Sequence, residues 1–328
     1  MKGFLKKLYG GAFLSESESR LALLLISEGK ASDAEIASFL TVYLMRPITV
    51  EELTGFRNLL MEIVLPLPIE GPAMDLCGTG GDAKNTFNVS TLSALVIAAC
   101  GVRVVKHGNY GVSSLSGSSN VLEYLGYSFT NNSDSLQKEM EANGICFLHA
   151  PLFHPALGKV AHIRKSLGVK TFFNMLGPLV NPAQPSHRMT GVYSLELARM
   201  YHYLLQKEKD TYLVVHDFGG YDEISGLSDV KVFSREGEGF IPRNILNMSV
   251  KEEQELYSGD SVASAAKIFV DVLQNRGTRA QREITLVNSA YALGVYNNKP
   301  ISECLEIAKE VLESGKPYSL LNKIIHKN

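Results

Sequence analysis

Hydrophobic residues recur at helical spacing through the first 65 residues of the chain. Leu21, Leu24 and Leu25 lie on one face of such a run, which ends near Gly29. Ser32–Glu35 and Thr49–Glu52 have the spacing of capping boxes. In a capping box, the residue before a helix and the residue three positions later each accept, with their side chains, a hydrogen bond from the other's backbone N–H group. The pattern therefore predicts that this region is entirely helical.

A proline-rich stretch, Leu65-Pro-Leu-Pro-Ile-Glu-Gly-Pro72, follows these helices. Proline lacks a backbone donor and clashes with the preceding helical turn, so no helix can continue through this segment. We place a domain boundary here, with a helical domain at residues 1–70 and a larger domain at residues 71–328.

Beyond the prolines, short β-branched runs alternate with amphipathic runs. Strands are predicted at Met74–Cys77, Val102–Lys106, Ile145–His149, Tyr212–His216 and Val230–Phe233, and helices at Thr91–Cys100, Ser118–Leu125 and Ser133–Ala142. Such alternation is typical of an α/β fold with a central, mostly parallel sheet flanked by helices. Further helices are predicted at Ser261–Leu273, Ala280–Leu293 and Ile301–Glu313, where they would cover the sheet.

The clearest chemical signal is a glycine-rich turn, Asp75-Leu-Cys-Gly-Thr-Gly-Gly-Asp82, followed by the hydroxyl-rich segment Asn85–Thr91. Glycines let backbone N–H groups converge, and the N-terminus of the next helix adds unpaired donors and partial positive charge. Residues 83–122 contain no Asp or Glu. This combination predicts a site for a highly charged phosphorylated ligand.

A dinucleotide site is the alternative for the same turn, because Gly78-Thr-Gly80-Gly-Asp-Ala83 satisfies a loose G-x-G-x-x-A spacing. That fingerprint also requires an acidic residue about 20 positions later to bind the ribose hydroxyls. The corresponding region, Ala98–Arg103, contains none. The sequence therefore disfavours NAD and favours a smaller phosphorylated ligand.

Two further loops are expected at the carboxyl ends of strands, where ligands of α/β folds bind. Lys106-His-Gly-Asn109 follows the second predicted strand. The hydroxyl-rich segment Ser113–Ser119 comes next, and it is either a second phosphate-binding loop or an ordinary solvent-exposed loop. Asp222 and Glu223 follow Gly219-Gly220, where carboxylates suit Mg²⁺ bound to phosphates. Arg164 could clamp a carboxylate or lie on the surface.

Composition narrows the possible partners. The net charge of −2 gives no broad attraction to nucleic acid or to an anionic membrane. The four cysteines are scattered without a C-x-x-C pair, as is typical of a cytoplasmic protein, and no secretory signal or membrane span is expected. The histidines lack zinc-ligand spacing, and the sequence contains no G-x-S-x-G nucleophile motif.

In series, these motifs resemble the anthranilate phosphoribosyltransferase family, whose fold is shared with pyrimidine nucleoside phosphorylases. The matching motifs run in order along the chain: Gly78–Asp82, Thr86–Thr91, Lys106–Asn109, Ser116–Gly126, Phe147, Ala150-Pro151, His154–Ala156, Arg164–Gly168, Thr171, Phe173-Asn174, Leu176–Leu179, Asn181-Pro182 and Asp222–Ser225. The resemblance implies transfer of the phosphoribosyl group of phosphoribosyl diphosphate (PRPP) to the amine of anthranilate, in tryptophan biosynthesis. It also implies a homodimer, and a returning segment near residues 160–180 that joins the helical domain.

Roles for individual residues follow from the same resemblance. Lys106, Asn109 and Arg164 would be catalytic, and Ser90, Asp222 and Glu223 would hold Mg²⁺ on the diphosphate. His107, Pro151, His154 and Gly177 would line the path of anthranilate. The full substrate-binding set would comprise Gly78, Thr79, Gly80, Gly81, Asp82, Thr86, Asn88, Val89, Ser90, Thr91, Lys106, His107, Gly108, Asn109, Ser118 and Arg164.

The sequence departs from the family pattern at two positions. Tyr110 replaces a common arginine, and Leu115 replaces a lysine, which we interpret as changes in loop mobility or affinity. Two rival functions are a pyrimidine nucleoside phosphorylase-like enzyme and a non-catalytic, nucleic-acid-binding member of the fold. Arg164 and the lack of the phosphorylase loops argue against the first, and the net charge and the retained Asp222-Glu223 pair argue against the second.

Overall fold

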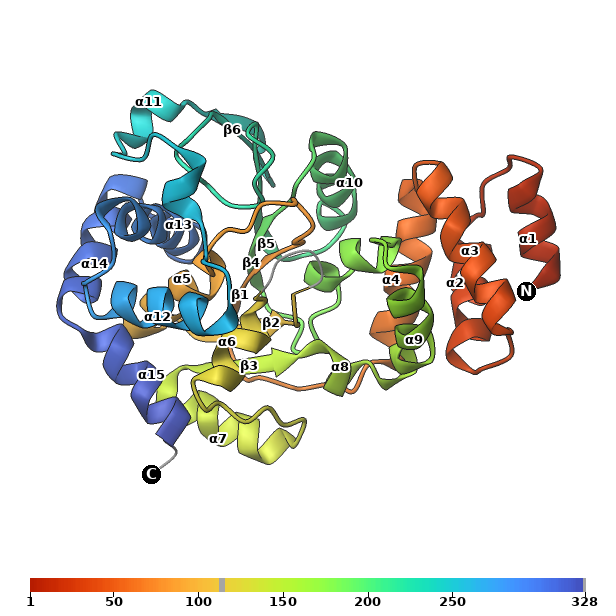
Figure 1. Ribbon diagram of the computed structural model, residues 1–328, viewed down its shortest axis with the longest axis horizontal. Helices are drawn as coiled ribbons and strands as arrows, with labels where there is room; N and C mark the ends of the chain where they lie inside the picture. Colours follow the sequence, from red (N-terminus) through yellow and green to blue (C-terminus); the bar gives the residue numbers. More distant parts are fainter. Residues whose placement is uncertain (112–115, 327–328) are drawn as a thin grey trace.

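A computed structural model describes residues 1–111 and 116–326 and shows a helical bundle beside a larger α/β body (Figure 1). The bundle contains α1 (Lys2–Tyr9), α2 (Glu16–Ser27), α3 (Asp33–Met45) and α4 (Val50–Ile63). The predicted capping boxes at Ser32 and Thr49 are confirmed, since each side chain accepts a hydrogen bond from the backbone of the glutamate three residues later.

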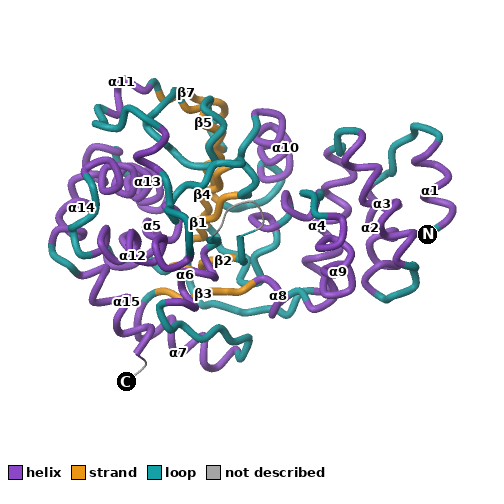
Figure 2. Tube along the Cα trace, viewed as in Figure 1, coloured by secondary structure: helices purple, strands orange, loops and turns teal. Residues whose placement is uncertain are grey.

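The α/β body is built on one seven-stranded sheet with the order β3-β2-β1-β4-β5-β6-β7. Its strands run side by side through the middle of the body (Figure 2). They are β1 (Met74–Gly78), β2 (Val104–Gly108), β3 (Ile145–His149), β4 (His187–Gly191), β5 (Thr211–Asp217), β6 (Val230–Ser234) and β7 (Gly237–Ile241). The first five strands are parallel, whereas β6 is antiparallel to β5 and β7 is antiparallel to β6. The predicted α/β fold with a mostly parallel sheet is confirmed.

Helices cover both faces of the sheet. The helices that follow the bundle along the chain are α5 (Val89–Ala99), α6 (Ser118–Tyr124), α7 (Ser133–Asn143), α8 (Ala150–Phe153), α9 (Gly158–Leu167), α10 (Leu195–Leu205), α11 (Arg243–Leu246), α12 (Val262–Leu273), α13 (Arg279–Asn297), α14 (Ile301–Glu313) and α15 (Lys316–His326). Short 3-10 helices lie at Pro155–Leu157, Phe172–Met175, Gly177–Leu179 and Glu253–Leu256. Within the described ranges, no helix is long and apolar enough to cross a membrane.

Strand β5 shows how the two faces are packed. Leu213 and Val215 belong to the core formed with α5 and α12–α15, whereas Tyr212 and Val214 belong to a core shared with α10 and the helical bundle. Alternate side chains of a strand point to opposite faces, so an almost continuous apolar run serves both cores. The second core also includes residues of α9, which lies against α3 (Figure 1).

Three expectations about the elements were wrong in detail. The second strand was predicted at Val102–Lys106, but β2 begins two residues later and extends to Gly108, so His107 and Gly108 lie within the strand and not after it. The next helix was predicted to begin at Thr91, but α5 begins at Val89, which places Ser90 and Thr91 in its first turn. Strands β4 and β7 were not predicted, because neither has a run of β-branched or aromatic residues.

Candidate active site

A cavity of about 260 Å³ lies at the carboxyl ends of β1 and β2. The chain runs from β1 outward to β3 and then returns to place β4 on the other side of β1. Ligands of open α/β sheets bind beside such a reversal of strand order. The three loops expected to converge, at residues 78–82, 106–109 and 217–223, all contribute to this cavity.

The glycine turn after β1 is shaped by a close approach of the acidic loop. A Cβ atom on Gly78 would lie 2.2 Å from Asp222 Oδ2, and one on Gly191 would lie 1.4 Å from the Asp222 carbonyl oxygen. Gly80 and Gly81 have φ values of 60° and 81°, which favour glycine, and the N–H of Gly80 donates to Asp222 Oδ2 at 2.7 Å. The glycines therefore allow the two loops to touch.

The N-terminus of α5 points its polar residues at the same cavity. Its N-cap residue, Asn88, makes no side-chain capping bond, and its amide donates instead to the Ser116 carbonyl at 3.2 Å. Thr86 Oγ1, Asn88 Oδ1 and Thr91 Oγ1 are buried and have no hydrogen-bond partner among the described residues. The two threonine hydroxyls can donate to an anionic ligand at this helix N-terminus, whereas the Asn88 oxygen can only accept, for example from a ligand hydroxyl.

Lys106 lies at the base of the cavity, where it is only 3% exposed. Its Nζ donates to the Leu76 carbonyl at 2.6 Å and to Ser90 Oγ at 3.3 Å. A lysine ammonium has three donors, and these two contacts leave one for a ligand oxygen. The side chain is thus fixed between β1 and the first turn of α5.

His107 and His154 form the apolar side of the cavity, with ring centroids 5.8 Å apart. His107 Nδ1 pairs with the Gly177 carbonyl at 3.0 Å, and His154 Nε2 pairs with the Val180 carbonyl at 3.0 Å. Carbonyl oxygens only accept, so each histidine carries its proton on the bonded nitrogen. Burial lowers the pKa of each ring to about 4, and both are neutral near pH 7.

A buried polar network behind β2 fixes the orientation of His107. Asp75 Oδ1 accepts from the backbone N–H of His107 at 3.2 Å, and Asp75 Oδ2 accepts from the side-chain amide of Asn181 at 2.8 Å. The same Asn181 nitrogen donates to the Val105 carbonyl at 2.8 Å. Burial raises the pKa of Asp75, an effect that neighbouring Lys106 opposes.

Arg164 reaches the cavity from α9, on the side of the helical bundle. Its guanidinium donates to Asn174 Oδ1 at 3.2 Å and lies 5.3 Å from the centre of the Phe173 ring. The guanidinium has five donors, so most remain for a ligand. Burial lowers the pKa of Arg164. Asn109 lines the same cavity, and its Oδ1 accepts from the Tyr110 N–H at 2.8 Å, which leaves its amide N–H groups for a ligand.

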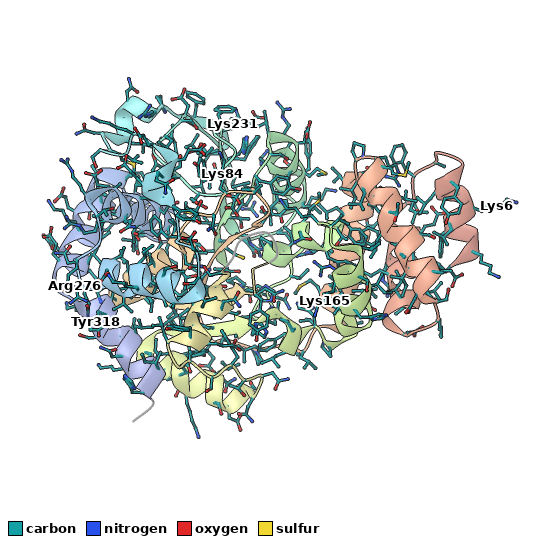
Figure 3. All side chains as sticks on the ribbon, in the orientation of Figure 1. Lys6, Lys84, Lys165, Lys231, Arg276 and Tyr318 are labelled. Atoms are coloured by element: carbon teal, nitrogen blue, oxygen red, sulfur yellow. The ribbon has the colours of Figure 1, made fainter. Side chains whose placement is uncertain are left out.

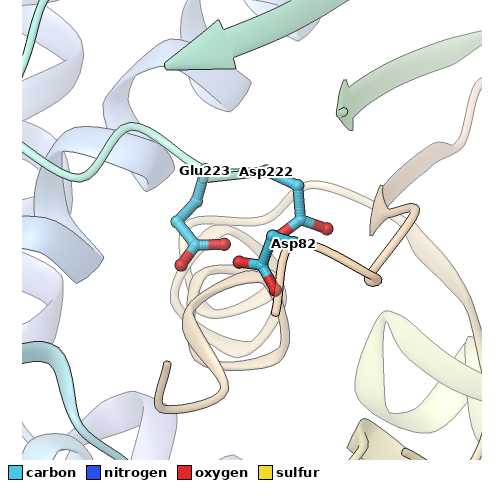
Figure 4. A group of neighbouring side chains, drawn as sticks. All are labelled: Asp82, Asp222 and Glu223. Atoms are coloured by element: carbon cyan, nitrogen blue, oxygen red, sulfur yellow. The ribbon is translucent and has the colours of Figure 1, made fainter. Parts of the chain in front are cut away.

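Three carboxylates meet at the opposite end of the cavity. Asp82, Asp222 and Glu223 each offer an oxygen within 4.8 Å of the others, and their side chains point toward one another in Figure 4. Burial, followed by the Asp222 charge, raises the pKa of Asp82 to about 7 and that of Glu223 well above its ordinary value. Glu223 Oε1 is buried, with no partner in the described parts of the chain.

This donor set fits a magnesium ion. Mg²⁺ binds protein carboxylates together with substrate phosphates and waters, and a divalent cation would favour the ionised carboxylates that burial and mutual repulsion now disfavour. Ser90 was predicted to join the metal ligands, and its Oγ accepts from Lys106 beside the same cavity. Asp82 was assigned only to substrate binding, and the structure places it with the two predicted acids.

The residues predicted to bind PRPP or the metal all line this one cavity. Of the residues predicted on the path of anthranilate, His107, His154 and Gly177 line it, whereas Pro151 does not. Ser113 and Leu115 lie outside the described residues. Sequence reasoning missed Lys170, whose ammonium contacts the Gly81 carbonyl, and it missed Gly191 at the end of β4. Tyr110, half-exposed on the cavity wall, donates to Glu123 at 2.8 Å and packs against His149.

Comparisons with known proteins agree with this chemistry. Residues 2–62 match the family described as "Glycosyl transferase family, helical bundle domain", and residues 70–318 match "Glycosyl transferase family, a/b domain". The anthranilate phosphoribosyltransferase of Christiangramia forsetii is 48% identical over 325 residues, covering 99% of this chain and 98% of the relative. That of Bacteroides fragilis is 47% identical over 330 residues and covers 100% of both.

Solved structures give the same match. The anthranilate phosphoribosyltransferase of Thermus thermophilus superposes with a TM-score of 0.89 at 31% identity, covering 98% of each chain. The Saccharomyces cerevisiae enzyme in complex with PRPP and Mg gives a TM-score of 0.91 at 27% identity, covering 99% of this chain and 96% of that one. The predicted family resemblance is confirmed: the chain belongs to the anthranilate phosphoribosyltransferase family.

Proposed function

We propose that the cavity binds PRPP and anthranilate side by side and transfers the phosphoribosyl group to the anthranilate amine, releasing diphosphate. The observation that carries this proposal is the polarity of the cavity. Three carboxylates, a glycine turn and Lys106 lie at one end, and Arg164 enters from α9 at the other. One end of the cavity therefore suits a metal-bound diphosphate, and the other end suits a carboxylate.

The diphosphate end uses the residues that follow β1 and begin α5. The backbone N–H groups of Gly81 and Ser90 would bind phosphate oxygens, and Lys106 adds a fixed positive charge. The N–H groups of Thr79 and Gly80 already donate to the Gly191 carbonyl and to Asp222, and they shape the turn instead. Mg²⁺, held by Asp82, Asp222, Glu223 and Ser90, would neutralise charge on the departing diphosphate. The relative crystallised with PRPP and Mg supports this assignment.

The acceptor end uses Arg164 and Asn109 to hold the anthranilate carboxylate. The arginine fork matches a carboxylate geometrically, and its partly buried position strengthens the pairing. A yeast relative in complex with 4-fluoroanthranilate, with a TM-score of 0.87 and 26% identity, supports an aromatic carboxylate here.

No strong base is needed in this reaction, because an aryl amine is already neutral at pH 7 and can attack directly. Neutral His107 and His154 fit such a site, since they add no charge beside the amine. The chain's residues then act by holding the amine against the ribose carbon and by stabilising charge as the diphosphate leaves.

The assigned ends predict separable kinetic defects. Arg164→Ala should raise KM for anthranilate by about 10–100-fold, equivalent to losing a charge-assisted bond of about 1.5–3 kcal/mol, and leave KM for PRPP within about twofold. Lys165→Ala is the matched control, because Lys165 is exposed on the same helix (Figure 3). Initial rates measured by anthranilate fluorescence test this. Equal effects on both KM values would reject the assignment of the two ends.

We propose that residues 1–70, with the returning segment near 160–180, form the helical domain, residues 71–328 form the PRPP-binding domain, and the protein is a cytoplasmic homodimer. The core that the bundle shares with α9 supports the domain assignment.

Met45 and Tyr9, which are 84% and 62% exposed on the N-terminal helices, support a dimer surface there. The four cysteines, all free, suit a reducing compartment. The mass of the parent and of Met45→Glu, measured by sedimentation, tests this assembly. A parent protein that sediments as a monomer would contradict the dimer.

A further inference from the structure

Asn288, at the middle of α13, contacts the acidic loop from outside the cavity. The side chain is 4% exposed. Its Oδ1 accepts from the Ile224 N–H at 3.1 Å, and its Nδ2 donates to the Ile224 carbonyl at 3.0 Å and to the Ile284 carbonyl at 2.9 Å. One side-chain amide therefore pairs with both backbone polar groups of the residue that follows Glu223.

This pairing fixes the direction of the peptide after Glu223. The backbone groups of Ile224 are buried with their residue, so without Asn288 they would lose their partner, at a cost of about 1–3 kcal/mol each. The loop could recover that energy only by moving its backbone. Any such movement carries Glu223 and Asp222 with it.

A second anchor acts on the next residue. Buried Asp217 accepts from the Ser225 N–H at 3.2 Å and from Ser225 Oγ at 2.6 Å. On the other side, the carbonyl of Asp222 rests against Gly191 with no room for a side chain between them. The acidic pair is thus fixed on both sides by residues that are not predicted ligands.

Helix α13 also contacts the diphosphate end of the cavity through α5. Ser93 Oγ of α5 donates to the Thr285 carbonyl of α13 at 3.2 Å. A small cavity of about 20 Å³ behind the acids is lined by Asn288, Glu223 and Ser90, among others. One helix therefore supports both the acidic loop and the helix that begins at Asn88.

We infer that Asn288 is a positioning residue for the metal site: its amide sets the orientation of Asp222 and Glu223 toward the ion. This rests on the proposed function, since it assumes that these acids hold the metal. It assigns to α13 a role that the cavity lining alone does not reveal, because Asn288 does not line the main cavity.

The test is Asn288→Ala, compared with Ser289→Ala. Ser289 is buried on the same helix and donates only to the Thr285 carbonyl within it, so it is a matched control. Loss of residues that orient metal ligands typically weakens metal affinity by about 10–100-fold. We expect the Mg²⁺ concentration for half-maximal activity to rise by about that factor in Asn288→Ala, with KM for anthranilate within about twofold. Ser289→Ala should match the parent in both.

Electron paramagnetic resonance measures Mn²⁺ binding directly, with diphosphate present, and gives a readout that does not depend on turnover. Asn288→Ala should weaken Mn²⁺ binding by a similar factor. Ser225→Ala removes the hydroxyl bond to Asp217 and the bond that Ser225 Oγ accepts from the Leu227 N–H, and it should weaken Mn²⁺ binding in the same direction. This variant serves as the test if Asn288→Ala does not fold.

Parent-like Mn²⁺ binding and Mg²⁺ dependence in Asn288→Ala, or in folded Ser225→Ala if the first variant does not fold, would overturn the inference. A similar rise in KM for both substrates, without a metal effect, would also overturn it and indicate a purely structural role. A parent protein that binds Mn²⁺ but does not consume anthranilate would contradict the proposed function while leaving the role of Asn288 measurable. A parent that binds no Mn²⁺ would contradict the metal site and the inference together.

Discussion

At the scale of single residues, the cavity depends on side chains whose hydrogen-bond partners fix their state. His107 is the clearest case, because its Nδ1–H is committed to the Gly177 carbonyl and its ring is 1% exposed. Burial lowers its pKa from 6.5 to about 4. A residue that lines the cavity therefore also makes the fold sensitive to acid.

The predicted consequence concerns stability below neutral pH. Between pH 6.5 and about 4 the unfolded chain binds a proton at His107 that the folded chain does not, so stability is fully present above pH 6.5 and falls as the pH decreases. The depressed pKa corresponds to about 3 kcal/mol. His107→Asn can keep the bond to Gly177 through its amide, and the free energy of unfolding should fall less steeply from pH 7 to pH 4.5. Urea unfolding at both pH values measures this, and parallel losses in parent and variant would contradict it.

At the scale of elements, the sequence predicted those parts of the site that local chemistry determines. The glycine turn is predictable because Gly80 and Gly81 need positive φ, and Asp222-Glu223 because paired acids follow a strand. Strand β4 was missed because His187–Gly191 has a single large apolar residue and is stabilised by pairing with β1 and β5. Asn288 was also missed, since its partner Ile224 is brought close only by the fold.

The contact between β4 and the acidic loop gives an element-scale prediction. In Gly191→Ala the new Cβ would fall 1.4 Å from the Asp222 carbonyl oxygen, so the loop must move away from the end of β4. We expect the Mg²⁺ requirement to rise by at least about tenfold, because the ligands shift together. Gly158→Ala on α9 is the control, since no described atom lies within 4 Å of its added Cβ. Similar magnesium titrations for both variants would show that the close approach does not matter.

At the scale of the whole molecule, the acceptor end of the cavity depends on the helical bundle. Arg164 lies on α9, and the following segment places Phe172 among Phe39, Tyr43 and Phe56. The Phe172 and Phe56 rings stack with centroids 4.4 Å apart. The bundle and the returning segment therefore share one core, and the position of Arg164 depends on it.

Phe172→Ala should accordingly destabilise the protein by about 3–5 kcal/mol, as expected for removal of a buried aromatic ring. Phe172 is 2% exposed, whereas Phe240, the control, is 52% exposed on β7. Phe240→Ala should change the free energy of unfolding by no more than about 0.5 kcal/mol. Urea denaturation followed by circular dichroism provides both values. Equal losses would indicate that the shared aromatic core does not hold the two parts together.

The most direct measurement follows anthranilate fluorescence in the presence of PRPP and Mg²⁺, with the Asp222→Asn/Glu223→Gln double variant alongside the parent. Consumption of anthranilate by the parent should require both PRPP and the metal. The double variant should lose most of the rate, because only Asp82 of the three carboxylates remains. No turnover by the folded parent, or a fully active double variant, would contradict the proposed transfer at this cavity.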